Sequence, residues 1–106
     1  MEFKSEGKYL VVSPEGDFDV ETSRSLKEEV RKRILSGTSN IIIDLTNVSY
    51  VDSSGLGTLI ALQKDARLNG GSVSIVGASS QIKRVMKMTN LDKLFAFYDK
   101  LEEVIK

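Results

Sequence analysis

The chain contains 106 residues, and its 15 lysines and arginines equal its 15 aspartates and glutamates, so that the formal net charge at pH 7 is zero. This length is typical of a single domain, and a hydrophobic content of 41% is enough for a core. Because the sequence contains neither cysteine nor histidine, it excludes disulfides, Cys/His zinc sites, a cysteine nucleophile and a Ser-His-Asp triad. We therefore expect one domain over residues 1–106, without a metal site.

The charge and hydropathy patterns also restrict the partners of the protein. The balanced charge lacks the basic excess of proteins that bind nucleic-acid phosphates. The basic residues at positions 27 and 31–33 are accompanied by Glu28 and Glu29, which is typical of a solvated helix face. No apolar run approaches 18 residues, and residues 1–9 contain no apolar signal segment. We expect a cytoplasmic protein that neither binds nucleic acid nor inserts into a membrane.

The N-terminal segment predicts a β-hairpin. Residues 8–13 contain a short apolar run, and Gly7 separates this run from an earlier strand at residues 2–5. A loop over residues 17–19 then leads into the first helix.

That first helix is predicted because apolar residues recur at every fourth position before Gly37. The next run, residues 41–45, is β-branched and does not alternate with polar residues, which predicts a central strand covered on both faces. A link over residues 46–50 follows. The apolar positions of the helix are Leu26, Val30 and Ile34, and its candidate N-caps are Asp19, Thr22 and Ser23.

The remaining sequence predicts two more strands and three more helices. A helix opens at residues 51–55 and is followed by a strand at residues 73–76, and residues 77–80 cap the next helix. Residues 95–98 form the last strand before a final helix. The alternation predicts an α/β fold with a mostly parallel central sheet, an antiparallel N-terminal hairpin strand and flanking helices. The apolar helix positions are Leu56, Leu59, Ile60, Leu62 and Ala66, then Ile82, Val85 and Met86, then Leu101, Val104 and Ile105.

Loops at the carboxyl ends of the strands are where such sheets carry function. Gly55 and Gly57 do not make a dinucleotide fingerprint, because Ile60 stands where a third glycine is needed, and no glycine precedes Lys-Ser or Lys-Thr. We therefore predict no nucleotide cofactor. The loops of interest are residues 17–22, 52–57 and 77–80.

Two hydroxyls, Ser53 and Ser54, stand at the start of the second helix, where unpaired backbone N–H groups and the helix dipole favour negative charge. A plain N-cap is the simplest interpretation. However, no Glu or Gln follows at the position of a capping box, and two glycines occupy the first turns. Because glycine destabilises a helix and lets another backbone approach closely, we predict a docking surface around Gly55 and Gly57.

These residues also carry a family resemblance. Asp44 and Leu45, together with the run Val-Ser-Tyr-Val-Asp-Ser-Ser-Gly-Leu-Gly at residues 48–57, resemble the signature of the STAS domain, the sulfate transporter and anti-sigma factor antagonist family. The run Gly-Asp-Phe-Asp at residues 16–19 resembles the family's Gly-x-Leu-Asp loop, and residues 90–95 are similar to its C-terminal segment. The resemblance extends over essentially the whole chain.

The resemblance implies a bacterial partner-switching protein that is not itself an enzyme. The unphosphorylated antagonist would bind an anti-sigma factor that is also a serine/threonine kinase, release the sigma factor, and lose this binding when phosphorylated; a serine phosphatase would reset it. Carried over, Ser53 is the phosphoacceptor and Ser54 is the second choice. Asp52 would orient the hydroxyl, and Asp19 would contribute from the adjacent loop. The implied partner-binding residues are Asp19, Thr22, Asp52, Ser54, Gly55, Leu56 and Gly57.

Charge alone explains how such a switch could work. A phosphate on Ser53 adds about −1.5 to −2 charges, which a helix N-terminus tolerates. With Asp19 and Asp52 nearby, the loop becomes strongly anionic, and like-charge contacts across an interface cost several kcal/mol.

Two alternatives remain open. A receiver-like domain that phosphorylates its own aspartate with Mg²⁺ would use Asp17 and Asp19 as its acidic pair, Asp52 as acceptor, Ser79 as hydroxyl and Lys100 as lysine. This alternative conflicts with the hairpin, which puts two strands before the first helix. The second alternative is a STAS accessory or scaffold subunit of a transporter or signalling complex, without serine phosphorylation.

Overall fold

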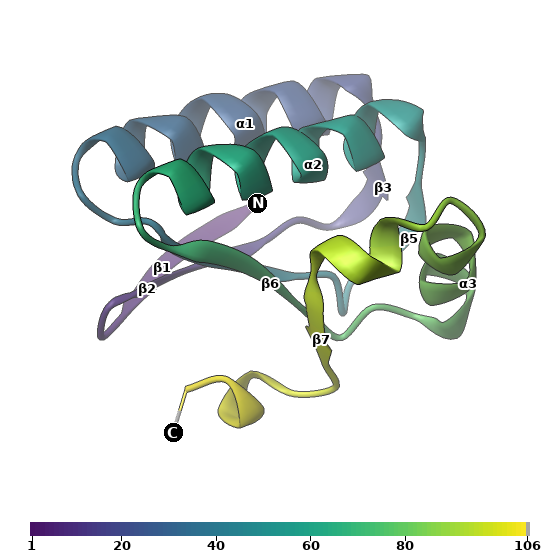
Figure 1. Ribbon diagram of the computed structural model, residues 1–106. Helices are drawn as coiled ribbons and strands as arrows, with labels where there is room; N and C mark the ends of the chain where they lie inside the picture. The colour runs from purple at the N-terminus through teal and green to yellow at the C-terminus, as the bar shows by residue number, and fades with distance from the viewer. Residues whose placement is uncertain (106) are drawn as a thin grey trace.

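A five-stranded sheet forms the centre of the fold in the computed structural model, which describes residues 1–105 (Figure 1). β1 (Glu2–Glu6) and β2 (Tyr9–Ser13) form the predicted antiparallel hairpin. The sheet continues in parallel through β4 (Asn40–Asp44), β6 (Ser72–Val76) and β7 (Ala96–Tyr98), in the order β1-β2-β4-β6-β7. The predicted α/β fold class is therefore confirmed.

Two short strands lie outside this sheet and were not expected. β3 (Gly16–Phe18) and β5 (Val48–Val51) pair in parallel as a separate two-stranded ribbon. The predictions of a loop over residues 17–19 and a link over residues 46–50 are therefore wrong. Both strands are too short to show a periodic pattern, since β3 buries only its last residue and β5 buries only its first and last residues.

Two long helices, α1 (Val20–Leu35) and α2 (Ser53–Leu68), lie side by side over one face of the sheet (Figure 1). Most of the expected apolar positions are buried, namely Leu26, Val30 and Ile34 in α1 and Leu59, Leu62 and Ala66 in α2. Two positions expected on the buried side of α2 differ, because Leu56 is half-buried and Ile60 is exposed. α3 (Ser80–Met88) lies beside β5, as the same figure shows, and buries Ile82 and Met86 in the core. Among the described residues, no helix has both the length and the apolar run needed to cross a membrane.

The opposite face of the sheet is covered by the C-terminal segment (Figure 1). The predicted final helix is wrong, since this segment forms only one 3₁₀ turn, η2 (Leu101–Glu103). So few residues cannot compensate for the cost of nucleating a regular α-helix. In the centre of the sheet, the predicted burial of β4 on both faces is confirmed. Ile41 and Ile43 join the core under the helices, whereas Ile42 joins a smaller cluster with Val11, Val76, Leu101, Val104 and Ile105.

Candidate functional site

The ribbon of β3 and β5 brings two of the predicted loops together. Phe18 of β3 pairs with Val51 of β5, and each of these strands leads directly into a helix. The backbone N–H of Asp52 donates to the carbonyl of Phe18 at 3.3 Å, which ties the two strand ends to each other. Asp19 and Asp52 therefore follow paired positions, and the N-termini of α1 and α2 lie at the same end of the molecule.

Both aspartates cap the helix that they precede. The Asp19 carboxylate accepts from the backbone N–H of Thr22 at 3.1 Å, and Asp52 accepts from that of Gly55 at 2.9 Å. The Thr22 N–H holds the pKa of Asp19 below its usual value, because the bond favours the charged carboxylate. Asp52 therefore acts as the N-cap of α2, and within the described residues no hydrogen bond joins its side chain to that of Ser53.

Ser53 is therefore not an N-cap, and the capping interpretation of the two serines is wrong. Ser53 is the first residue of α2 and its side chain is exposed, whereas Ser54 is half-buried. Within residues 1–105, the Ser53 hydroxyl forms no hydrogen bond, and the first turn of α2 contains no acidic residue. The result is a free hydroxyl at a helix start whose dipole favours an added negative charge.

The two glycines of α2 occupy different surroundings. A Cβ atom on Gly55 would lie 2.7 Å from the Phe18 carbonyl oxygen and 2.9 Å from a methyl carbon of Val51. Gly55 is therefore needed for close packing of α2 on the ribbon, and the expectation that its bare backbone leaves room for a partner is not supported. Gly57 is exposed, and a Cβ there would meet nothing within 4 Å. Only at Gly57 does the missing side chain leave a surface open.

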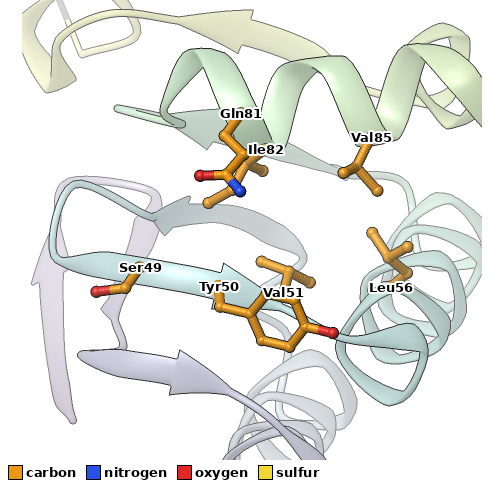
Figure 2. A pocket seen from close by; sticks show the side chains of 7 residues that line it. All are labelled: Ser49, Tyr50, Val51, Leu56, Gln81, Ile82 and Val85. Atoms are coloured by element: carbon orange, nitrogen blue, oxygen red, sulfur yellow. The ribbon is translucent and has the colours of Figure 1, made fainter.

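An apolar groove lies directly beside this helix start, between β5, α2 and α3 (Figure 2). The close-up shows Tyr50, Val51 and Leu56 on one side and the α3 residues on the other. The predicted site residue Leu56 is half-buried and belongs to this groove. The sequence interpretation missed the other walls, because it placed Tyr50 in a link and Val85 on the core face of its helix. The lining residues are Ser49, Tyr50, Val51, Leu56, Gln81, Ile82 and Val85.

The residues of the receiver-like alternative do not assemble into an ion site. Within residues 1–105, no three acidic side chains come together in a group that could hold a metal ion. Asp19 and Asp52 are occupied by helix capping, and Ser79 caps α3 by accepting from the Ile82 N–H at 3.1 Å. The hairpin also places β1 and β2 before the acidic loop, as the sequence predicted.

Comparisons with known proteins identify the family of the chain. The model of the STAS domain family matches residues 1–104, so the chain belongs to this family. The anti-sigma-B factor antagonist of Staphylococcus aureus is 34% identical over 89% of this chain and 87% of its own length. An anti-sigma factor antagonist structure from Mycobacterium paratuberculosis superposes with a TM-score of 0.85 at 25% identity, covering 98% of this chain and 88% of that one.

More distant structures share the fold alone. SpoIIAA, an anti-sigma factor antagonist solved in its unphosphorylated form, superposes with a TM-score of 0.86 at 19% identity, covering 98% of this chain and 91% of that one. A sulfate transporter family protein from Wolinella succinogenes superposes with a TM-score of 0.80 at 14% identity, covering 92% and 81%. The fold therefore occurs in more than one functional setting.

Proposed function

We propose that this protein is an anti-sigma factor antagonist. In its unphosphorylated form it binds an anti-sigma factor that is also a serine kinase, and so releases the sigma factor into the bacterial cytoplasm. Phosphorylation of Ser53 ends this binding, and a serine phosphatase restores it. The observation that carries the proposal is the exposed hydroxyl of Ser53, left unbonded because Asp52 caps the helix. The identity to the staphylococcal antagonist supports the class of partner.

The geometry around Ser53 suits a switch that changes binding without unfolding the domain. A phosphate at the first residue of α2 meets unpaired backbone N–H groups and the positive end of the helix dipole, so the free protein tolerates it. The same phosphate joins the carboxylates of Asp19 and Asp52 on one surface. A partner that accepts two negative charges then faces a third group of about −1.5 to −2 charges. Electrostatic repulsion at the interface therefore opposes binding.

The partner surface includes the exposed residues around this hydroxyl. Gly57 lies one turn beyond Ser53 on the open side of α2, and Leu56 lines the neighbouring groove. Ser54 is the second choice as acceptor, because it is adjacent to Ser53 but partly covered. Asp19 and Thr22 extend the surface onto the start of α1, whereas Gly55 acts inside the domain.

Phosphorylation by a purified kinase tests the proposal. Each anti-sigma factor kinase encoded in the same genome would be incubated with the protein, ATP and Mg²⁺, and the product mapped by mass spectrometry. We expect one phosphate, on Ser53, and none on the Ser53→Ala variant. Phosphate on Ser54 alone would move the acceptor. A kinase that binds the protein tightly but transfers no phosphate would contradict the switch.

A second candidate function is a STAS subunit of a transporter or signalling complex without serine phosphorylation. The likeness to the Wolinella sulfate transporter family protein favours this candidate at the level of the fold. The two functions differ in their dependence on Ser53. Binding to the physiological partner that is unchanged by Ser53→Asp would favour the accessory role over the antagonist role.

A further inference from the structure

The first half of α2 exposes a surface that is unusual for a helix facing solvent. From Ser53 to Gln63 the helix contains no charged residue. Leu56 and Ile60 follow Ser53 at intervals of three and seven positions, so all three lie on the same side of the helix. Gly57 and Ile60 are exposed and Leu56 is half-buried. A solvent-facing helix surface without charge is typical of an interface.

The groove continues this surface from α2 onto α3. Its walls are mostly apolar, with Ser49 and Gln81 as the polar lining residues, and two of the apolar ones remain open to solvent in the free protein, with Tyr50 56% exposed and Val85 37% exposed. Met88 is 76% exposed and lies one turn beyond Val85 on the same side of α3. The sequence predicts Leu56, Ile60 and Val85 as apolar helix positions, yet none of them is fully buried in the domain core.

Opposite charges border the two sides of the groove. The start of α2 lies beside the carboxylates of Asp19 and Asp52, whereas α3 contains three basic residues and no acidic one. Lys83 pairs with Asp99 at 3.3 Å, but Arg84 and Lys87 are exposed and form no ion pair within residues 1–105. Arg84 lies next to Gln81 and Met88 on the surface of α3, so a basic group stands at the groove's edge.

We infer that this groove receives an apolar side chain of the anti-sigma factor kinase, with an acidic residue of the same segment directed toward Arg84. The inference rests on the proposed function and extends its surface to Tyr50, Gln81 and Val85. A volume of about 50 Å³ admits part of one side chain, whereas drug-sized ligands occupy roughly 300–1,000 Å³. Because Leu56 belongs both to the groove and to the helix that starts at Ser53, the docked side chain aligns the kinase over the acceptor hydroxyl.

Two matched variants test the apolar contact. Val85→Gln removes an apolar wall of the groove, and Leu68→Gln makes the same kind of change at the far end of α2, where Leu68 is 75% exposed. Leu68 is mostly exposed and Val85 lines an open groove, so neither change removes a fully buried side chain, and thermal melts of the free proteins should show only small losses. By calorimetric titration with the cognate kinase, we expect Val85→Gln to bind at least about tenfold more weakly and Leu68→Gln to bind as the wild type.

Phosphorylation kinetics separate docking from chemistry. The Val85→Gln variant keeps Ser53, so its KM for phosphorylation should rise while kcat at saturation stays unchanged. Tyr50→Gln, on the opposite wall, should give the same pattern. Arg84→Glu should weaken binding as well, whereas Lys32→Glu on α1, with the same change in net charge, should not.

The inference and the proposed function can fail separately. If the wild type binds the kinase, Ser53→Asp loses that binding and Val85→Gln and Tyr50→Gln retain it, the antagonist role stands and the groove inference is overturned. If the wild type binds none of the anti-sigma factor kinases encoded in its genome, the proposed function fails and the groove inference fails with it.

Discussion

The two long helices share a design at their N-termini and differ in what they expose. Each has 16 residues, follows a strand of the β3–β5 ribbon and begins after an aspartate whose carboxylate accepts from a backbone N–H three residues later. The difference is charge. In α2, charged residues appear only at Lys64, Asp65 and Arg67, whereas α1 contains Glu21, Arg24, Lys27, Glu28, Glu29, Arg31, Lys32 and Arg33.

This difference distinguishes a surface made for water from one made for a partner. The charged side of α1 forms ordinary surface pairs, such as Arg33 with Glu29 at 3.2 Å, which contribute little to stability. Such a surface is well hydrated, and it makes docking costly because charges must lose their water. The start of α2 avoids this cost. Capping and packing are therefore common to both helices, whereas the lack of charge is specific to the helix with Ser53.

The largest expected effect is the loss of partner affinity when a negative charge is placed on the α2 surface. Ser53→Asp should bind the anti-sigma factor kinase roughly a hundredfold more weakly, since like-charge contact costs several kcal/mol and ~3 kcal/mol exceeds a hundredfold. Ser53→Ala should bind as the wild type. Because Asp52 provides the cap, neither variant should lose much stability. Titration calorimetry and thermal melts give both quantities, and equal binding by the two variants would contradict the charge mechanism.

The second effect compares the two glycines within α2. Gly57→Leu should weaken partner binding by about tenfold or more through steric exclusion, while the free domain is as stable or more stable, because almost any residue favours a helix over glycine. Gly55→Ala, in contrast, should lower the stability of the free domain. Its Cβ would press on the Phe18 carbonyl, and overpacking costs roughly 1–3 kcal/mol. A large fall in the melting temperature of free Gly57→Leu would refute the docking role.

The third effect measures what capping contributes at the α2 start. Asp52→Ala removes the acceptor of the Gly55 N–H and should destabilise the domain by about 0.5–2 kcal/mol. Asp52→Asn keeps an acceptor and should recover most of that loss. Urea unfolding of the three proteins gives the free energies. If Asp52→Ala is as stable as the wild type, the Asp52 cap contributes nothing to stability. The explanation that Ser53 is free because Asp52 caps the helix would then be wrong.

Much of the fold was predictable because its main elements are long and periodic. The helices over residues 20–35 and 53–68 have apolar residues spaced for one buried face, and the middle of β4 is three consecutive buried isoleucines. The β3–β5 ribbon was not predictable, since three and four residues give no period and only pairing reveals them. The prediction of a final helix was wrong because a short apolar segment can pack as a 3₁₀ turn.

The sequence predicted the candidate site as a motif, but this prediction did not include the whole surface around it. The family resemblance pointed to Asp19, Asp52 and Ser53 as candidate site residues, but which residue caps the helix depends on backbone position and not on composition. The groove joins residues from three elements, so no local pattern contains it. Val85 shows the limit most clearly. An apolar residue at helical spacing predicts core, and only the position of α2 decides that this one lines an open groove.

The smallest expected effect concerns the α1 start and depends on pH. The Thr22 N–H lowers the pKa of Asp19 in the folded protein, so the charged carboxylate favours the folded state. A lowered pKa contributes stability that is present above the unfolded value of about 3.9 and is lost as the pH falls through the folded value.

Asp19→Asn isolates this charge, because asparagine also caps a helix but does not titrate. We expect the wild type to be slightly more stable than the variant at pH 7, with the difference shrinking below about pH 4 and vanishing in stronger acid. Salt should reduce it as well, since the Asp19 side chain is exposed to solvent. Urea unfolding across this pH range measures the effect. If the difference stays constant from neutral to acid pH, the cap acts through its oxygen atom and not through its charge. The starts of α1 and α2 would then differ only in the charged residues on the rest of their surfaces.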